Sequence, residues 1–489
     1  MPPSHACSPF LPVILLAACI HFPASPDIAA RPADPAGSVL IQDVLLFGAD
    51  PADPSAQPHM DVRIEGGRIT DIGATGTVPR ADVIYSGVGR TLLPGFVDLH
   101  VHLGLQAGPP WFLMAPDTPQ AAQSMVYSGV TTVLDVGGRI EVIERLQAQI
   151  AAGQWLGPRI RFAGPGLTVQ DAYPLDMARE VYGALAFASM NGNDFIAVED
   201  VADIEAQVDR IADAGGTFIK LMAASIPPAD PPTPRLSEGW MLAATERAHS
   251  RGLRVAAHID TAEDALICAR VGVDMLAHGV ETTLLSPEQL ATLKASGIAY
   301  EPTLVNWRRF DQLAVGEFHP TTLEVATQPA AVLASLSKAK LLAHQSVLDE
   351  SSFKAWGDAL TAHTADRVAN TRAVFEAGIP LRVGTDSNGS IGTFPGSYHE
   401  ELRLLVAAGV PTLDVLLAAT SGNAMLLDGR DPDGDRVPDV APDYGQVKVG
   451  LQADLVLVEG DPTQDIAATE HVVQVWVAGQ PVRAPGADG

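Results

Sequence analysis

The sequence predicts an α/β protein in which a (β/α)8 TIM barrel is joined to a small composite β-sandwich formed by the N- and C-terminal segments. Two observations predict this architecture: strand-like runs alternate with helix-like segments in the middle of the chain, and short strand-like runs gather near each end. Alternating strands and helices are typical of a parallel sheet covered by helices. With 489 residues, 47% of them hydrophobic, the chain can bury the large core that such a fold needs.

The first 19 residues predict a signal peptide. An apolar run over residues 10–18 is too short to cross a bilayer as a helix but has the length of a signal-peptide core. It ends in Leu-Ala-Ala-Cys, which resembles the lipobox of bacterial lipoproteins and implies lipidation of Cys19 and anchoring in the periplasm. Lys and Arg are absent before Arg31, so a signal that is cleaved without lipidation and a misassigned start codon remain alternatives.

We divide the chain into five parts on these patterns. They are the signal peptide with its lipobox-like end (1–19), a linker rich in Pro, Ala and Asp (20–37), the first part of the β-sandwich (38–92), the barrel (93–425) and the second part of the sandwich (426–485).

Eight apolar runs alternate with helix-like segments between the two strand-rich ends. The stretch over 306–378 is long and mostly helical in pattern, so we expect an enlarged crossover there. The predicted barrel strands cover residues 92–102, 131–138, 159–166, 217–225, 254–260, 275–280, 298–304 and 381–387.

The composition excludes some classes of function. The formal net charge of −27 comes from 58 acidic against 31 basic residues, which argues against a nucleic acid as partner. The chain has three cysteines. If Cys19 carries lipid and Cys7 is removed with the signal, only Cys268 remains, so an internal disulfide is not expected and Cys268 is a small core residue.

The first barrel strand carries a pair of histidines at its end. His100 and His102 are two residues apart, and this spacing places both side chains on the same face of a β-strand. Two imidazoles on one face can chelate a single metal ion.

Four later strands add side chains of the same chemical kind near their carboxyl ends, where (β/α)8 enzymes assemble their active sites. His258 and His278 are twenty residues apart, which is close to one strand, one helix and the return, so we expect them on adjacent strands. The four residues are Lys220, His258, His278 and Asp386.

The ordered set GFVDLHVH, FIK, AAH, AHG and GTDS is similar to the amidohydrolase superfamily, in particular its imidazolonepropionase-like and Xaa-Pro dipeptidase-like members. The resemblance covers most of the chain and includes the terminal ADLVLVEGDP, which in that family belongs to the β-module beside the barrel. It implies a binuclear centre of two divalent ions, for which zinc suits the ligands best. His100, His102 and Asp386 would hold one ion, His258 and His278 the other, and Lys220, carboxylated to N6-carboxylysine, would bridge them.

The resemblance also implies a mechanism. Two cations that share one water lower its pKa, so that a bridging hydroxide attacks the polarised carbonyl of an amide. Asp386 would accept the water's proton and then deliver it to the leaving amine. Imidazolonepropionases use one metal and lack the lysine, so Lys220 favours the binuclear subtype.

The substrate expected from these considerations is a dipeptide, an Xaa-Pro-like dipeptide or an N-acyl amino acid. A cyclic amide or a lactone remains an alternative, because the same metal chemistry serves it. A non-catalytic metal-binding lipoprotein is a further alternative, although a storage site does not need an acid-base carboxylate beside its metals. The sequence leaves the oligomeric state open.

Loops after the strands supply the candidate substrate contacts Trp111, Tyr173 and Arg308. A free substrate carboxylate needs a cationic partner, and Arg308 is the candidate for it.

Further polar residues are interpreted as structural. We expect Asp98, one step deeper on the first strand, to orient a neighbour. Tyr398, His399 and Glu400 are interpreted as the solvated first turn of a helix, with indirect support of the site as the alternative. The acidic run over 431–439 is interpreted as a plain loop, because it lacks the turn glycine and closing Glu of a calcium loop.

Overall fold

The computed structural model describes residues 28, 37–109, 112, 115–179, 183–224, 234–337, 361–431 and 440–482 of the chain. The predicted signal peptide with Cys19, the candidate contact Trp111 and residues 432–439 of the acidic run lie outside the described residues. Among the helices that are described, none is long and apolar enough to cross a membrane.

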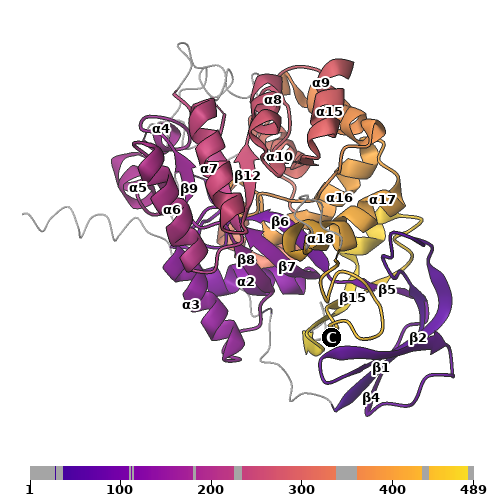
Figure 1. Ribbon diagram of the computed structural model, residues 1–489. Helices are drawn as coiled ribbons and strands as arrows, with labels where there is room; N and C mark the ends of the chain where they lie inside the picture. The colour runs from indigo at the N-terminus through magenta and orange to yellow at the C-terminus, as the bar shows by residue number, and fades with distance from the viewer. Residues whose placement is uncertain are drawn as a thin grey trace, which may run out of the picture.

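The two ends of the chain share one mixed sheet, at the lower right of Figure 1. β5 pairs antiparallel with β15, with Pro94 opposite Leu455, as the strand-rich composition of both ends predicts. Trp476 of β16 is fully buried in the core of this sheet. Its strands are β1 (Ser38–Leu46), β2 (Gln57–Glu65), β3 (Arg68–Ala74), β4 (Val83–Ser86), β5 (Arg90–Pro94), β15 (Leu455–Glu459), β16 (Val472–Val477) and β17 (Gln480–Val482).

Parallel strands form the centre of the molecule in two sheets, one of order β6-β7-β8 and one of order β10-β9-β11-β12-β13-β14. Every residue of β6, β7 and β11 is buried, as expected for parallel strands covered on both faces. The bounds are β6 (Phe96–Val101), β7 (Val130–Asp135), β8 (Arg159–Phe162), β9 (Gly166–Thr168), β10 (Phe195–Ala197), β11 (Phe218–Met222), β12 (Arg254–His258), β13 (Met275–Ala277) and β14 (Ala299–Glu301).

The predicted strand over 381–387 does not form a regular ladder. It makes isolated parallel bridges, from Leu381 to Tyr300 of β14 and from Ser387 to Val101 of β6. The segment leaves the β conformation at Asp386, whose φ is 59°. It therefore lies between β14 and β6 and delivers Asp386 beside the end of β6. The short strands β9 and β10 are not predicted by the sequence pattern.

Helices surround these strands (Figure 1). The described part of 306–378 is mostly helical, as predicted. The helices are α2 (Thr118–Tyr127), α3 (Ile140–Ala151), α4 (Leu175–Met177), α5 (Gly183–Met190), α6 (Val201–Asp213), α7 (Glu238–Ser250), α8 (Ala262–Val271), α9 (Pro287–Ser296), α10 (Leu304–Ala314), α11 (Thr322–Thr327), α12 (Ala330–Ser335), α15 (Thr364–Ala377), α16 (Tyr398–Ala407), α17 (Thr412–Leu417) and α18 (Asn423–Asp428), with the shorter helical turns η2 (Pro395–Ser397), η3 (Ala418–Gly422) and η4 (Ile466–Glu470).

Candidate metal centre and active site

His100 and His102 lie at the end of β6, and both are buried. Beneath them, Asp98 accepts hydrogen bonds at Oδ1 from the backbone N–H of His100 (3.0 Å) and of Thr385 (3.1 Å). Asp98 therefore joins β6 to the segment that carries Asp386 and positions a neighbour, as predicted. Burial raises the pKa of Asp98 to about 7.

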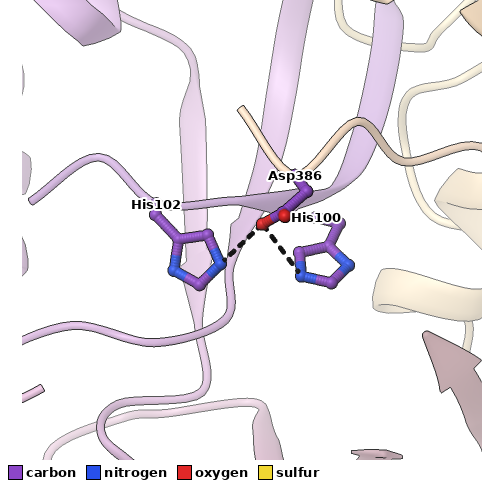
Figure 2. A group of neighbouring side chains, drawn as sticks. All are labelled: His100, His102 and Asp386. Carbon is purple, nitrogen blue, oxygen red and sulfur yellow. Dashed lines mark ion pairs between the residues drawn. The ribbon is translucent and has the colours of Figure 1, made fainter. Parts of the chain in front are cut away.

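Asp386 faces both histidines (Figure 2). Its Oδ1 lies 3.1 Å from Nε2 of His102 and 3.6 Å from Nε2 of His100. One ligand atom from each of these three buried residues lies within 4.8 Å of the others, which is the proximity that a shared metal ion requires.

The other nitrogen of each ring is held by a hydrogen bond that turns Nε2 toward the centre. Nδ1 of His102 lies 3.1 Å from the carbonyl oxygen of Gly137, and Nδ1 of His100 lies 2.9 Å from Oε2 of Glu301. The carbonyl of Gly137 can only accept, so Nδ1 of His102 donates. When His102 is neutral, the lone pair of its Nε2 faces a carboxylate oxygen of Asp386, and a cation held by both atoms would make this contact favourable. The donor set thus fits a metal ion.

His258 and His278 lie at the ends of the neighbouring strands β12 and β13, where His258 is paired with Ala277. Their ring centroids are 4.3 Å apart, and that of His278 is 4.7 Å from that of His100. Nδ1 of His278 is hydrogen bonded to Oγ1 of Thr303 at 2.9 Å. The structure therefore places the second predicted pair directly beside the first.

Lys220 of β11 completes the group. Its Nζ lies 3.4 Å from Nε2 of His100, and the side chain is buried. Burial lowers the pKa of Lys220 to about 8, although Glu301 and Asp386 act in the opposite direction. A substantial fraction of this amine is therefore neutral near pH 8. The structure thus brings all six predicted residues together.

Three non-glycine residues of the site have left-handed backbone conformations: His278 (φ 78°), Thr303 (φ 43°) and Asp386 (φ 59°). Such conformations cost about 1–3 kcal/mol each and gather at functional sites, where the surrounding structure holds them. Here they turn the chain sharply just after β13, after β14 and between the two bridges that Leu381 and Ser387 make.

Sequence reasoning missed four residues that support the site: Glu301, Thr303, Asn306 and Ser390. Asn306 and Ser390 donate hydrogen bonds to Oδ2 of Asp386, at 3.1 Å and 2.5 Å. Glu301 was recognisable as an acid at the end of a buried apolar run. The sequence pattern holds no comparable signal for Asn306.

The candidate substrate contacts differ in position. Tyr173 is half-buried, and its ring centroid lies 4.7 Å from that of His258. Arg308 is exposed on α10, whereas the next residue, Arg309, is buried and pairs with Glu324 and Glu400.

The prediction of a solvated first turn at residues 398–400 is wrong for two of its residues. Tyr398 is buried and donates a hydrogen bond from its hydroxyl to the carbonyl of Val97 (2.9 Å). His399 is buried and donates from Nε2 to the carbonyl of Ser128 (2.8 Å). Both side chains join α16 to the strands and loops of the core, because this helix begins inside the molecule.

Parallel strands that bring imidazole, carboxylate and amine groups to one end define a class of α/β enzymes whose active sites lie at the carboxyl ends of the strands. The chain belongs to the amidohydrolase family, whose family model matches residues 91–482. Membership of this family makes the protein a hydrolase and confirms the resemblance seen in the sequence.

Known relatives span most of the chain. It is 26% identical over 426 residues to an uncharacterised protein of Mycobacterium tuberculosis, covering 85% of this chain and 90% of the relative. Among solved structures it is similar to a Xaa-Pro dipeptidase with bound methionine (22% identity, TM-score 0.69, 92% of this chain and 100% of the other). It is also similar to a putative prolidase from Bifidobacterium longum (24%, 0.67, 93% and 96%) and to ochratoxinase of A. niger (19%, 0.69, 93% and 97%). These structural likenesses show a common fold.

Proposed function

We propose that this protein is a binuclear metal-dependent amidohydrolase that hydrolyses the amide bond of a dipeptide, Xaa-Pro-like or otherwise, or of an N-acyl amino acid. The observation that carries the proposal is the convergence of His100, His102 and Asp386, with both Nε2 atoms directed at one carboxylate oxygen.

Two divalent ions would be held by the six residues of this site. His100, His102 and Asp386 would bind one, His258 and His278 the other, and Lys220 both. When bound, such ions supply an activated water and polarise the substrate carbonyl. Zinc suits these nitrogen and oxygen donors best.

Asp386 would act as the proton carrier of the reaction. Asn306 and Ser390 hold its Oδ2, which leaves Oδ1 directed at the histidines. In this position the carboxylate accepts the proton that the attacking water loses. It then returns the proton to the leaving nitrogen, which must be protonated to depart as an amine.

Lys220 would bind both ions as a carbamate. The ammonium first loses one proton, and the neutral amine then attacks carbon dioxide. A C–N bond forms as one C=O π bond breaks, a second proton is released, and the side chain becomes an anionic carbamate with two oxygen donors. The lowered pKa of Lys220, which burial causes, favours this neutral amine. An ammonium group would instead repel the ions.

Three features support the substrate class and the architecture. The structural relatives include a Xaa-Pro dipeptidase and a putative prolidase. Hydrogen bonds connect residues 381–387 to both β14 and β6, and the N–H of Thr217 bonds to the carbonyl of Phe162, which supports a (β/α)8 barrel. The pairing of β5 with β15 supports a β-sandwich made of both ends.

The test is hydrolysis of a panel of dipeptides, N-acyl amino acids, lactams and lactones by metal-loaded and chelator-treated protein. We expect metal-dependent turnover of a dipeptide or an N-acyl amino acid. Asp386→Asn should lower kcat by about 10²–10⁴-fold, while the matched control Asp414→Asn, at an exposed position of α17, should leave it unchanged. Turnover of lactams or lactones alone would replace the substrate class. Metal retention without any turnover would indicate a binding protein.

We also propose export to the bacterial periplasm with a lipid on Cys19, which rests on the sequence alone. Membrane fractionation of the full chain and of Cys19→Ala tests it. Release of the variant into the soluble fraction is expected, and equal fractionation of both proteins would contradict it.

A further inference from the structure

A second group of side chains, three of them buried and one half-buried (Trp307), lies on the His258 side of the candidate metal centre. It consists of Asp260, Glu281, Trp307 and Arg367, which we call the charged group. Oδ1 of Asp260 is 3.6 Å from Nε2 of His258, and the N–H of Glu281 donates to the carbonyl of Asp260 at 2.9 Å. Trp307 lies on α10 and Arg367 on α15, two helices that lie side by side in Figure 1.

Arg367 is buried but poorly paired. It is 5% exposed, and its guanidinium carbon lies 4.2 Å from the centroid of the Trp307 ring. The carboxylate oxygen of Glu281 is 3.8 Å from the nearer terminal nitrogen, beyond hydrogen-bond range. Nε and Nη1 of Arg367 have no hydrogen-bond partner. Buried N–H groups are nearly always paired, and those of a charged group are especially costly to leave unpaired.

The same group also holds acceptors and a donor without partners. Oδ2 of Asp260, Oε1 of Glu281 and Nε1 of Trp307 are buried and lack a hydrogen bond. Burial, followed by the charge of Asp260, holds the pKa of Glu281 well above its usual range. A bound cation would favour the ionised form of Glu281 and satisfy these acceptor oxygens, while Nε and Nη1 of Arg367 can donate to an anion.

A neighbouring arginine shows how this chain satisfies a purely structural one. Arg309 is fully buried two residues after Trp307, and its Nη2 lies 2.8 Å from Glu324 and 2.7 Å from Glu400. Its Nη1 donates to Gln312 and to the carbonyl of His319. Both terminal nitrogens of Arg309 are therefore used and its Nε lacks a partner, whereas Arg367 lacks a partner at both Nε and Nη1.

We propose that the charged group binds the two charged ends of the substrate, with Arg367 receiving a carboxylate and Asp260 and Glu281 an ammonium. The inference rests on the proposed function and deepens it, because it selects unblocked dipeptides over N-acyl amino acids, lactams and lactones. Arg367 then takes the role that the sequence suggested for the exposed Arg308. A guanidinium stacked on an indole ring presents its N–H groups edge-on to a carboxylate.

The experiment compares three substrates on the metal-loaded enzyme: alanylproline, its N-acetyl derivative and its C-terminal amide. Wild type should prefer alanylproline. In Arg367→Met, the ratio of kcat/KM for alanylproline to kcat/KM for the amide should fall about 10- to 100-fold, mainly because KM for alanylproline rises. Arg367→Lys should retain part of this preference. Glu281→Gln should lose preference over the N-acetyl derivative. The matched control Arg372→Met, at an exposed site on the same helix paired with Glu376, should change neither ratio.

Each outcome decides the inference. The inference would be overturned if Arg367→Lys and Glu281→Gln kept the wild-type substrate preferences with normal metal content and thermal stability. These two variants also replace Arg367→Met in the test if that variant does not fold. Preferred hydrolysis of blocked amides or lactones would also overturn it but would leave a metal-dependent hydrolase. If alanylproline is not hydrolysed, calorimetry separates the cases. Tighter binding by wild type than by Arg367→Lys would support the charged group and contradict the dipeptidase, whereas equal binding by both or absence of binding would contradict both.

Discussion

Asn306 donates a hydrogen bond of 3.1 Å from Nδ2 to Oδ2 of Asp386, and both residues are buried. The contact joins the first turn of α10 to a segment 80 residues further along the chain. It fixes the rotation of the carboxylate, so that Oδ1 remains 3.1 Å from Nε2 of His102. An amide outside the metal-binding group thus sets the direction of the proposed proton carrier.

Replacing Asn306 tests this role. Asn306→Ala should lower kcat about 10- to 100-fold, because a hydrogen bond to a charged group contributes about 1.5–3 kcal/mol. Metal content should stay at the wild-type level, because Asn306 is not among the proposed ligands. The exposed Asn193→Ala serves as control. Unchanged kcat in the first variant would show that Asp386 does not need this contact.

Asp386→Asn should lower kcat by about 10²–10⁴-fold, since an amide cannot accept the proton that general base catalysis removes. It should also weaken metal binding at the pair His100 and His102. Steady-state rates at saturating metal separate the two effects. Activity restored by metal alone would limit Asp386 to a ligand role.

Glu301 is expected to act through His100, whose Nδ1 it holds at 2.9 Å. Glu301→Ala frees this ring and should weaken metal affinity about 10- to 100-fold, as is typical when the hydrogen-bond partner of a metal-binding histidine is lost. Competition with a chromophoric chelator measures the affinity. A dissociation constant equal to that of wild type would argue against this role.

Buried carboxyl groups predict how the stability of the apoprotein depends on pH. Burial raises the pKa of Glu401 from 4.5 to about 8, so the folded chain binds a proton that the unfolded chain releases between these values. The free energy of unfolding should therefore fall as pH rises from 5 to 8. Glu401→Gln should reduce this fall by about 1–3 kcal/mol in denaturant titrations. An identical fall in the variant would show that Glu401 is ionised when folded.

Much of the site could be predicted because its chemistry follows strand geometry. The spacing of His100 and His102 fixes their shared face, and the ends of parallel strands meet at one edge, which brings Lys220, His258 and His278 to the same place.

Other features depend on packing that no local pattern encodes. In the sequence, Arg367 has the pattern of an ordinary helix residue. Its proposed role arises because α15 packs beside α10, which places Arg367 over the ring of Trp307. His399 seemed solvated because it is polar and begins a helix, yet the core supplies it with a carbonyl partner at 2.8 Å. β9 and β10 have three residues each, and no predicted ligand marks their ends, unlike the equally short β13, which His278 follows.

The central claim is a binuclear centre that depends on Lys220. The measurement that tests it most directly is the metal content of wild type and Lys220→Ala, purified without chelator in bicarbonate buffer and determined by mass spectrometry. The account predicts about two ions per chain in wild type and a marked loss in the variant, because the carbamate would bind both ions. One ion per chain, unchanged by the substitution, would contradict the bridge and indicate a mononuclear enzyme.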